Sequence, residues 1–274
     1  MSAPITIPAS TVTAILLTAA ALFLGPILLL ILLGIRRKLS ALPLILGFLS
    51  FFVAQPLTRL PLLSILSLQE GFQQFAAAHF VLYSLLIGGL TAGLFEESTR
   101  LAGALLLKRQ RSWKDAVSFG LGHGLCEVFL ISGMAQINNL IFVFLINHPA
   151  ICEAAGISAE LLTMAAQQLA AATPWTFGLS VLERVFAVIY HLFATVLIFW
   201  GVRRRRKAAA WAGAVLCHTL FNALASLVSA GWGILAAEFA IGVMAAMTLP
   251  AMRRLKKGFA EQVSWPSTVQ PSGQ

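Results

Sequence analysis

The sequence predicts an all-α, polytopic transmembrane helical bundle of about seven helices, with the N-terminus outside and the C-terminus cytoplasmic. Hydrophobic residues make up 59% and charged residues 11% of the 274 residues, and the mean hydropathy is +0.87. Seven apolar stretches each approach or exceed the length needed to cross about 30 Å of hydrocarbon. Basic residues collect between alternate stretches, which places those connections in the cytoplasm.

The expected spans differ in how regular they are. Pro56 interrupts the second span, and the apolar run resumes at Leu60, so we expect a kink or an interfacial extension there. The fourth span is longer than one crossing requires, and we expect it to tilt or break near Gln136, Asn138 and Asn139. The seven spans are expected at residues 11–34, 41–55, 80–107, 116–146, 177–201, 208–229 and 233–251.

The net charge of +9 is explained by membrane topology. The basic clusters fall at 36–38, 108–114, 203–207 and 253–257, and Arg59 is the one cation expected in the external connections. We therefore expect no nucleic-acid partner. The expected partner is the lipid bilayer. The expected location is the cell membrane, as a multi-pass protein, and this charge pattern favours a bacterial inner membrane.

Two connections and one tail complete the chain. Residues 57–78 are expected to form an external connection with an interfacial amphipathic helix. Residues 158–170 predict a further external helix capped by Ser158, either a lid on the membrane or a solvated linker. We expect a single transmembrane domain over 1–258, with its catalytic core at about 80–229, and a disordered cytoplasmic tail over 259–274.

The third span contains an unusual group of charges, Glu96, Glu97 and Arg100. A charge at bilayer depth costs at least a few kcal/mol, so intramembrane ionisable groups are read first as functional. On a helix Arg100 lies within reach of both carboxylates, at i+4 and i+3. The spacing therefore predicts one carboxylate paired with Arg100 and one left for another role.

Further polar groups occur in the fourth, fifth and sixth spans. His123 and Glu127 lie one turn apart beside glycines that allow a neighbouring helix to approach. Glu183, Arg184 and His191 follow in the fifth span, and His218 and Asn222 share a face of the sixth. Each set has a packing alternative, either as a hydrogen-bonded core residue or as an ion pair that holds helices together.

The depth of these residues joins them into one site. Glu96, Glu97, His123, His191 and His218 each lie nine to twelve residues from the nearest basic cluster. At about 1.5 Å per residue this places them all about 14 to 18 Å from the same boundary. Such a layer of carboxylates and imidazoles near the midplane requires a water-filled cavity.

Two hydrolytic chemistries fit this set. In the first, a Glu and a His activate water, while a second His and an Asn donate hydrogen bonds to the oxyanion. In the second, His123, His191 and His218 bind a divalent metal such as zinc, which lowers the pKa of its water. No short metal motif such as His-Glu-x-x-His is present, so we favour the mechanism without a cofactor.

Two functions from other classes are less consistent with the sequence. A proton- or cation-coupled transporter would use the same Glu and His residues as a relay, but the chain shows no internal repeat. A non-catalytic scaffold leaves the common depth of the polar residues unexplained. We therefore expect an enzyme, an intramembrane peptidase that acts on a membrane-embedded or membrane-associated peptide.

The ordered motifs resemble a known superfamily. Glu96-Glu97-x-x-Arg100, Phe119-x-x-x-His123 and His218-x-x-x-Asn222 resemble the CAAX-processing and bacteriocin-processing (CPBP or Abi) superfamily of glutamic intramembrane endopeptidases. The Gly-His-Gly-x-x-Glu motif at 122–127 and the Glu-Arg pair with a later His at 183–191 look like its YhfC branch. The resemblance covers about residues 94–222, and YhfC-like proteins are often labelled metalloproteases.

The resemblance implies roles for six residues. Glu96 would act as the base that activates water together with His123, and Glu97 paired with Arg100 would support the site. His218 and Asn222 would form the oxyanion site. Apart from the resemblance, we expect Glu127, Glu183, Arg184 and His191 as additional cavity residues. The wider superfamily usually places its Arg one residue further from the Glu pair, so the division of labour between Glu96 and Glu97 is not fixed by the resemblance.

Overall fold

The computed structural model describes residues 6–260, and every regular element within them is helical. Seven helices are long and apolar enough to cross a membrane, which confirms the predicted all-α polytopic bundle and a multi-pass membrane protein. The crossing segments are Ala9–Ile35, Ala41–Ser67, Phe80–Leu106, Trp113–Ile146, Pro174–Arg203, Lys207–Trp232 and Ile234–Ala260.

The first crossing segment is α-helix throughout, whereas the second and third also contain wide π-helical turns. After α1 (Ala9–Ile35), the second segment passes from α2 (Ala41–Phe52) through the π-helix η1 (Val53–Arg59) into α3 (Leu60–Ser67). The short helix α4 (Glu70–Ala78) follows outside the spans. The third segment consists of α5 (Phe80–Leu82), the π-helix η2 (Tyr83–Leu90) and α6 (Thr91–Leu106).

The remaining segments complete the bundle. The fourth combines α7 (Trp113–Glu127), the π-helix η3 (Val128–Gly133) and α8 (Met134–Ile146). Two helices then lie outside the spans, α9 (Pro149–Ala154) and α10 (Ala159–Ala171), and Ser158 caps the latter through the Leu161 amide. The last three segments are α11 (Pro174–Arg203), α12 (Lys207–Trp232) and α13 (Ile234–Ala260).

Several predicted boundaries were wrong. The second span continues to Ser67 instead of ending at Gln55, because Pro56 sits in the π-helical turn, which accommodates its missing N–H, and the helix is not broken. Arg59 therefore lies inside a span, and the external connection is shorter than 57–78. α13 runs through Phe259 and Ala260 instead of ending at Ala251, with basic residues favourably placed near its C-terminus.

For the fourth span, the tilt stays a prediction and the expected break at the amides is wrong. The helix α8 is continuous through these residues, and Asn139 donates to the side chain of Gln136 at 3.2 Å. The irregular turn comes earlier, at Val128–Gly133. Residues 259 and 260, where we expected the tail to begin, are helical, and the rest of the expected tail, 261–274, lies outside the described part of the chain.

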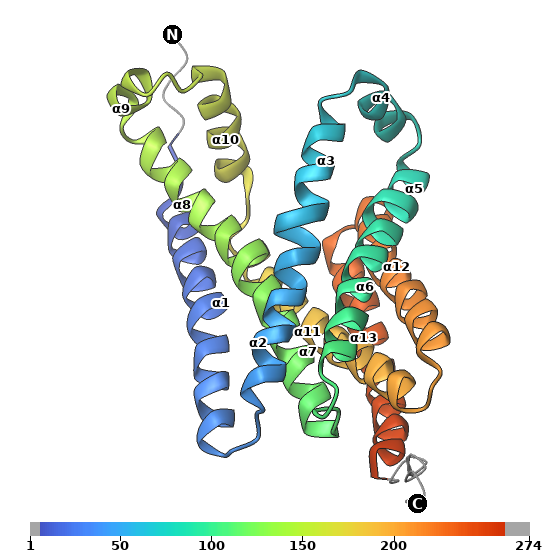
Figure 1. Cartoon of the computed structure of the whole chain (residues 1–274). Helices are drawn as coiled ribbons and strands as arrows, with labels where there is room; N and C mark the ends of the chain where they lie inside the picture. Colours follow the sequence, from blue (N-terminus) through green and yellow to red (C-terminus); the bar gives the residue numbers. More distant parts are fainter. Residues whose placement is uncertain (1–5, 261–274) are drawn as a thin grey trace, which may run out of the picture.

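The helices form one bundle, and the two ends of the described chain lie at opposite ends of it. α1 begins and α13 ends at opposite ends of the bundle (Figure 1). The connections α1–α2, α6–α7 and α11–α12, which carry basic clusters, all lie at the end where α13 finishes (Figure 1). The three basic connections therefore lie on one side of the bundle. That this side is the cytoplasmic one remains a prediction.

Close helix packing surrounds the middle of α7. A side chain at Gly122 would overlap the carbonyl oxygen of Leu44 in α2, and one at Gly47 would overlap the carbonyl oxygen of Phe119. On its other side, α7 meets α11, where Gly124 lies against Val188. His123 is consequently enclosed between α2 and α11, and its side chain is fully buried.

Candidate active site

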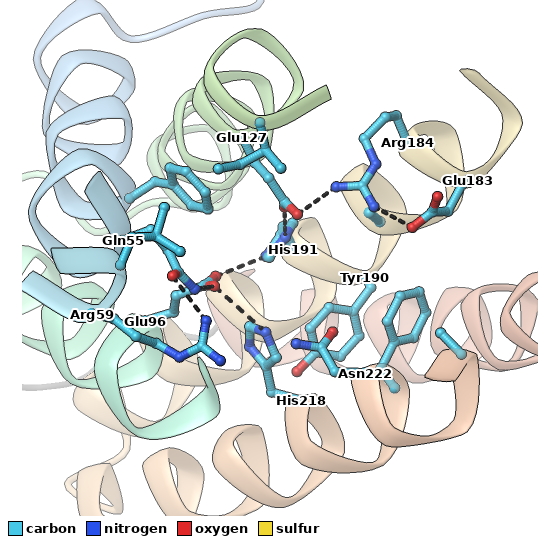
Figure 2. A pocket seen from close by; sticks show the side chains of 16 residues that line it. Gln55, Arg59, Glu96, Glu127, Glu183, Arg184, Tyr190, His191, His218 and Asn222 are labelled. Carbon is cyan, nitrogen blue, oxygen red and sulfur yellow. Dashed lines mark hydrogen bonds and ion pairs between the residues drawn. The ribbon is translucent and has the colours of Figure 1, made fainter. Parts of the chain in front are cut away.

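A cavity of about 190 Å³ lies within the bundle, lined by residues of α2, η1, α3, α6, α7, η3, α11 and α12. Its volume holds several water molecules, and its walls combine polar and apolar side chains. The polar side chains of the lining come from five of the seven spans and converge on the cavity (Figure 2). The polar and charged residues that line it are Gln55, Arg59, Glu96, Glu127, Glu183, Arg184, Tyr190, His191, His218 and Asn222.

Glu96 is the centre of this arrangement. Its Oε1 accepts a hydrogen bond from Gln55 Nε2 at 2.5 Å, and its Oε2 lies 3.0 Å from His123 Nε2. His218 Nε2 lies 3.7 Å from Oε1, and His191 Nδ1 lies 4.0 Å from Oε2. One carboxylate in α6 therefore faces three imidazoles from α7, α11 and α12.

Glu97 and Arg100 form a separate, deeper pair. Arg100 Nε lies 3.0 Å from Glu97 Oε2, and both side chains are fully buried. Neither residue lines the cavity. Arg100 also donates to the carbonyl of His191 at 2.7 Å and to Thr195 Oγ1 at 2.6 Å, so it ties α6 to α11. Arg100 thus neutralises Glu97, and Glu96 has no guanidinium partner within the described chain.

A second network enters the cavity from the side of α11. His191 Nε2 lies 2.6 Å from Glu127 Oε2, and Arg184 Nη1 donates to Glu127 Oε1 at 2.5 Å. Arg184 also pairs with Glu183. Figure 2 shows this chain of contacts running from Glu183 to His191. These four residues therefore form ion pairs between side chains, and they also line the cavity.

Hydrogen-bond partners determine where the protons of His123 and His218 lie. Ser50 Oγ donates to the Gly47 carbonyl at 2.7 Å, so it accepts from His123 Nδ1–H at 2.7 Å. Glu97 is ionised by its contact with Arg100 and accepts from His218 Nδ1–H at 2.8 Å. In both residues, Nε2 is the atom directed toward Glu96.

His191 is arranged in the opposite way. Arg100 has only donors, so its Nη2 donates to the His191 Nδ1 lone pair at 3.0 Å. His191 Nε2–H then donates to the Glu127 carboxylate. Both ring nitrogens are therefore occupied, and His191 in this state has no lone pair directed into the cavity.

Two further residues of the site, Gln55 and Arg59, were not predicted from the sequence. Gln55 donates to Glu96, and its own Oε1 accepts a hydrogen bond from Arg59 Nη1 at 3.1 Å. Arg59 is fixed in turn by Thr91 Oγ1 at 2.8 Å and the Ile87 carbonyl at 2.8 Å. The wide turn η1 carries both side chains to the cavity. Their signal in the sequence was an Arg near a proline in an otherwise cation-free region.

Asn222 and Tyr190 complete the wall opposite Glu96. Asn222 lies one helical turn beyond His218, lines the cavity and makes no side-chain hydrogen bond within residues 6–260. The Tyr190 ring meets His218 edge-on at a centroid distance of 5.3 Å, and its hydroxyl donates to the Ala214 carbonyl at 3.2 Å. The carboxamide of Asn222 is thus available to a bound molecule (Figure 2).

The position of His123 differs from that of the other imidazoles. It contacts Glu96 but is not among the residues that line the cavity. Glu96 therefore lies between His123 and any water in the cavity. The geometry assigns His123 to the back of the carboxylate, where it can share a proton with Glu96, and leaves His218 and Asn222 in front.

One group of side chains has the spacing of metal ligands. Atoms of Glu96, His123 and His191 lie within 4.8 Å of one another, and all three residues are buried. Catalytic zinc sites commonly use three protein ligands of these types. The atom of His191 nearest to Glu96 is Nδ1, which also accepts the hydrogen bond from Arg100.

Comparison with known proteins identifies relatives that match most of the bundle. The family described as YhfC intramembrane metalloprotease matches residues 21–245. The chain is also 29% identical over 249 residues to a protein from Bacillus subtilis (strain 168) named "Uncharacterized membrane protein YhfC". That alignment covers 89% of this chain and 95% of the relative. No solved structure matches significantly.

Proposed function

We propose that this chain, which belongs to the YhfC family of intramembrane proteases, hydrolyses peptide bonds with Glu96 as the general base. One observation carries the proposal. Of the carboxylates that line the cavity, Glu127 and Glu183 pair with Arg184, and Glu96 alone has no guanidinium partner in the described chain. An unpaired carboxylate facing water is available to accept a proton.

The proposed reaction begins with proton transfer to Glu96. A water in the cavity loses a proton to Glu96 as its oxygen attacks the carbonyl carbon of the scissile peptide. The bare Nε2 of neutral His123, 3.0 Å from Glu96 Oε2, then accepts a hydrogen bond from the protonated carboxyl. Before the reaction, that lone pair faces a carboxylate oxygen, and this repulsion favours proton uptake by Glu96.

The second part of the reaction uses His218 and Asn222. With Nδ1–H bound to Glu97, a protonated His218 presents Nε2–H to the cavity. This N–H and the Asn222 carboxamide donate to the oxyanion of the tetrahedral intermediate. Glu96 then returns its proton to the leaving amide nitrogen as the C–N bond breaks, so the proton taken from water ends on the product amine.

The charges around the cavity support this assignment. Glu96, Glu97, Glu127 and Glu183 are opposed by three guanidiniums, those of Arg59, Arg100 and Arg184. The network therefore carries one excess negative charge when its histidines are neutral. A single proton on His218 balances it, which keeps the buried site neutral in a medium of low dielectric constant.

Zinc hydrolysis is the second candidate, because the family is described as a metalloprotease and Glu96, His123 and His191 have ligand spacing. When bound, zinc would polarise the carbonyl and lower the pKa of a bound water. These residues do not fit it as they stand. Metal binding at His191 Nδ1 would displace the hydrogen bond from Arg100 and bring the ion close to a buried guanidinium. We therefore derive no step through a metal.

The same residues also bear on the superfamily to which the chain belongs. The order of Glu96-Glu97-x-x-Arg100, His123 and His218-x-x-x-Asn222, and their convergence on one cavity, support placing this chain with the CPBP glutamic peptidases. The substrate proposed is a membrane-embedded or membrane-associated peptide, because the cavity lies within the spans. We also propose that residues 1–258 act as one domain, to which α2 and η1 contribute Ser50, Gln55 and Arg59.

The test is turnover by purified protein reconstituted in liposomes with a panel of fluorogenic peptides. Glu96→Gln should abolish turnover and preserve the fold, because the amide is isosteric but accepts no proton. Glu70→Gln, at an exposed position in α4 outside the spans, is the matched control and should leave turnover unchanged. Substantial turnover by Glu96→Gln would contradict the assignment.

A further inference from the structure

A strongly basic hollow lies at the end of the bundle where α6, α7, α11 and α13 meet, far from the proposed active site along the same helices. Its volume is about 490 Å³. Of the lining residues within 6–260, five are cationic and none is acidic. The lining residues are Lys108, Arg109, Arg111, Ser112, Val202, Arg203, Arg205 and Phe259.

The backbone holds part of this positive charge in place. Arg111 donates to the carbonyls of Ala104 and Leu105, both at 2.9 Å. Arg203 donates to the carbonyls of Arg111 at 3.3 Å and Phe259 at 3.2 Å. These bonds fix two guanidiniums at the hollow although their like charges repel.

Asp115, the acid in the neighbouring turn, is bonded by Ser112 and forms no ion pair with Lys108, Arg109 or Arg205 within residues 6–260. Asp115 accepts from the backbone N–H and the hydroxyl of Ser112, at 2.9 and 2.7 Å, and so completes the capping box of α7. Partial burial lowers the pKa of the Arg111 guanidinium, so a nearby anion would stabilise its charged form. The chemistry of the hollow is therefore that of an anion site.

Its surroundings are those of a membrane interface. The Trp113 ring meets Phe259 edge-on at 5.7 Å, and Lys256 Nζ lies 5.4 Å from the Trp113 ring centre. Aromatic rings with basic neighbours are typical of the headgroup layer. Leu105 and Leu106, immediately before the basic segment, are 38% and 71% exposed. An apolar surface thus borders the cationic hollow on the side of the span.

We propose that this hollow binds the phosphodiester headgroup of an anionic phospholipid, with an acyl chain lying along Leu105 and Leu106. The basic side chains neutralise the phosphate and the headgroup, as basic pockets between helices do for anionic lipids. The exposed leucines distinguish a lipid from a free phosphate ion, which gains nothing from an apolar neighbour.

The test uses the full chain in non-ionic detergent and two short-chain lipids, dihexanoyl phosphatidylglycerol and dihexanoyl phosphatidylcholine, with inorganic phosphate as a third probe. Binding is measured by native mass spectrometry and by the shift in melting temperature. The wild type should bind phosphatidylglycerol at least about tenfold more tightly than either other probe.

Two triple variants distinguish a specific binding site from general attraction to positive charge. Lys108→Gln/Arg109→Gln/Arg205→Gln should weaken phosphatidylglycerol binding on the order of a hundredfold. Arg36→Gln/Arg37→Gln/Lys38→Gln removes three exposed cations at the same end of the bundle and should stay within about threefold of wild type. The triples are matched, since Arg37 and Arg205 both have a positive φ, of 52° and 58°.

Three results would overturn the proposal. Equal weakening in both triple variants would show general attraction to positive charge. Phosphate binding as tightly as phosphatidylglycerol would show a free-anion site, and equal binding of the two lipids would show no recognition of the headgroup charge. If the first triple variant does not fold, Lys108→Gln and Arg205→Gln alone should each weaken phosphatidylglycerol binding about fivefold, and wild-type affinity in both would refute the site.

Discussion

Arg100→Ala removes the guanidinium that neutralises Glu97, and the structure indicates how much stability this costs. Both side chains are fully buried, and Arg100 Nε lies 3.0 Å from Glu97 Oε2. Breaking a buried pair on one side leaves an uncompensated charge and costs about 3 to 5 kcal/mol. At about 2 to 4 °C per kcal/mol, the melting temperature should fall by about 6 to 20 °C.

The double variant Glu97→Gln/Arg100→Met isolates the charge from the rest of the side chain. It removes both charges, and a Gln at 97 still accepts the hydrogen bond from His218. The carbonyl of His191 keeps its hydrogen bond from Thr195 at 2.8 Å. Most of the stability lost in Arg100→Ala should therefore return.

The assay is thermal unfolding of the purified variants in detergent, followed by tryptophan fluorescence. A melting temperature for Arg100→Ala within about 2 °C of wild type would refute the buried pair, because it falls well below the smallest expected change. A double variant no more stable than Arg100→Ala would refute the argument that the unpaired charge is the cause.

Two further predictions concern the groups that hold Glu96 and the oxyanion. Gln55→Ala removes a hydrogen bond to an ionised carboxylate and should lower kcat about 10- to 100-fold with little change in KM; Gln74→Ala, on exposed α4, is the control, and an equal effect in both would contradict the role of Gln55. Asn222→Ala should lower kcat about 100- to 1000-fold at an unchanged melting temperature, because the side chain bonds nothing else within the described chain; an unchanged kcat, measured with the same peptides, would remove Asn222 from the oxyanion site.

Much of the architecture could be predicted from the distribution of apolar and basic residues along the sequence. Long apolar stretches determined seven spans, and the common distance from the basic clusters placed Glu96, His123, His191 and His218 in one layer. These signals are strong because charge inside a membrane is costly and because spans have a fixed length. The structure brings all four residues within reach of one another.

The parts that could not be predicted depend on local backbone geometry. Apolar periodicity cannot locate the π-helical turn at Val53–Arg59, which keeps the second span intact across Pro56 and turns Gln55 and Arg59 inward. Spacing also could not show that His123 lies behind Glu96, since that depends on how closely Gly122 lets α7 approach α2.

Hydrogen-bond direction was equally inaccessible from the sequence. The three histidines looked equivalent as ligands, and only the contacts of Arg100 and Glu127 distinguish His191 from the others. Such contacts join residues that are 64 and 91 positions apart in the chain. No local pattern records them.

The most direct test of the central claim measures bound metal and peptide turnover on the same wild-type preparation. The protein is purified through a chelator, its zinc content is measured by mass spectrometry, and turnover is measured in liposomes. Hydrolysis by Glu96 without a metal predicts full turnover at less than about 0.1 zinc per chain, because Glu96, His218 and Asn222 supply the base and the oxyanion donors. Turnover that rises in proportion to bound zinc, up to one ion per chain, would contradict it.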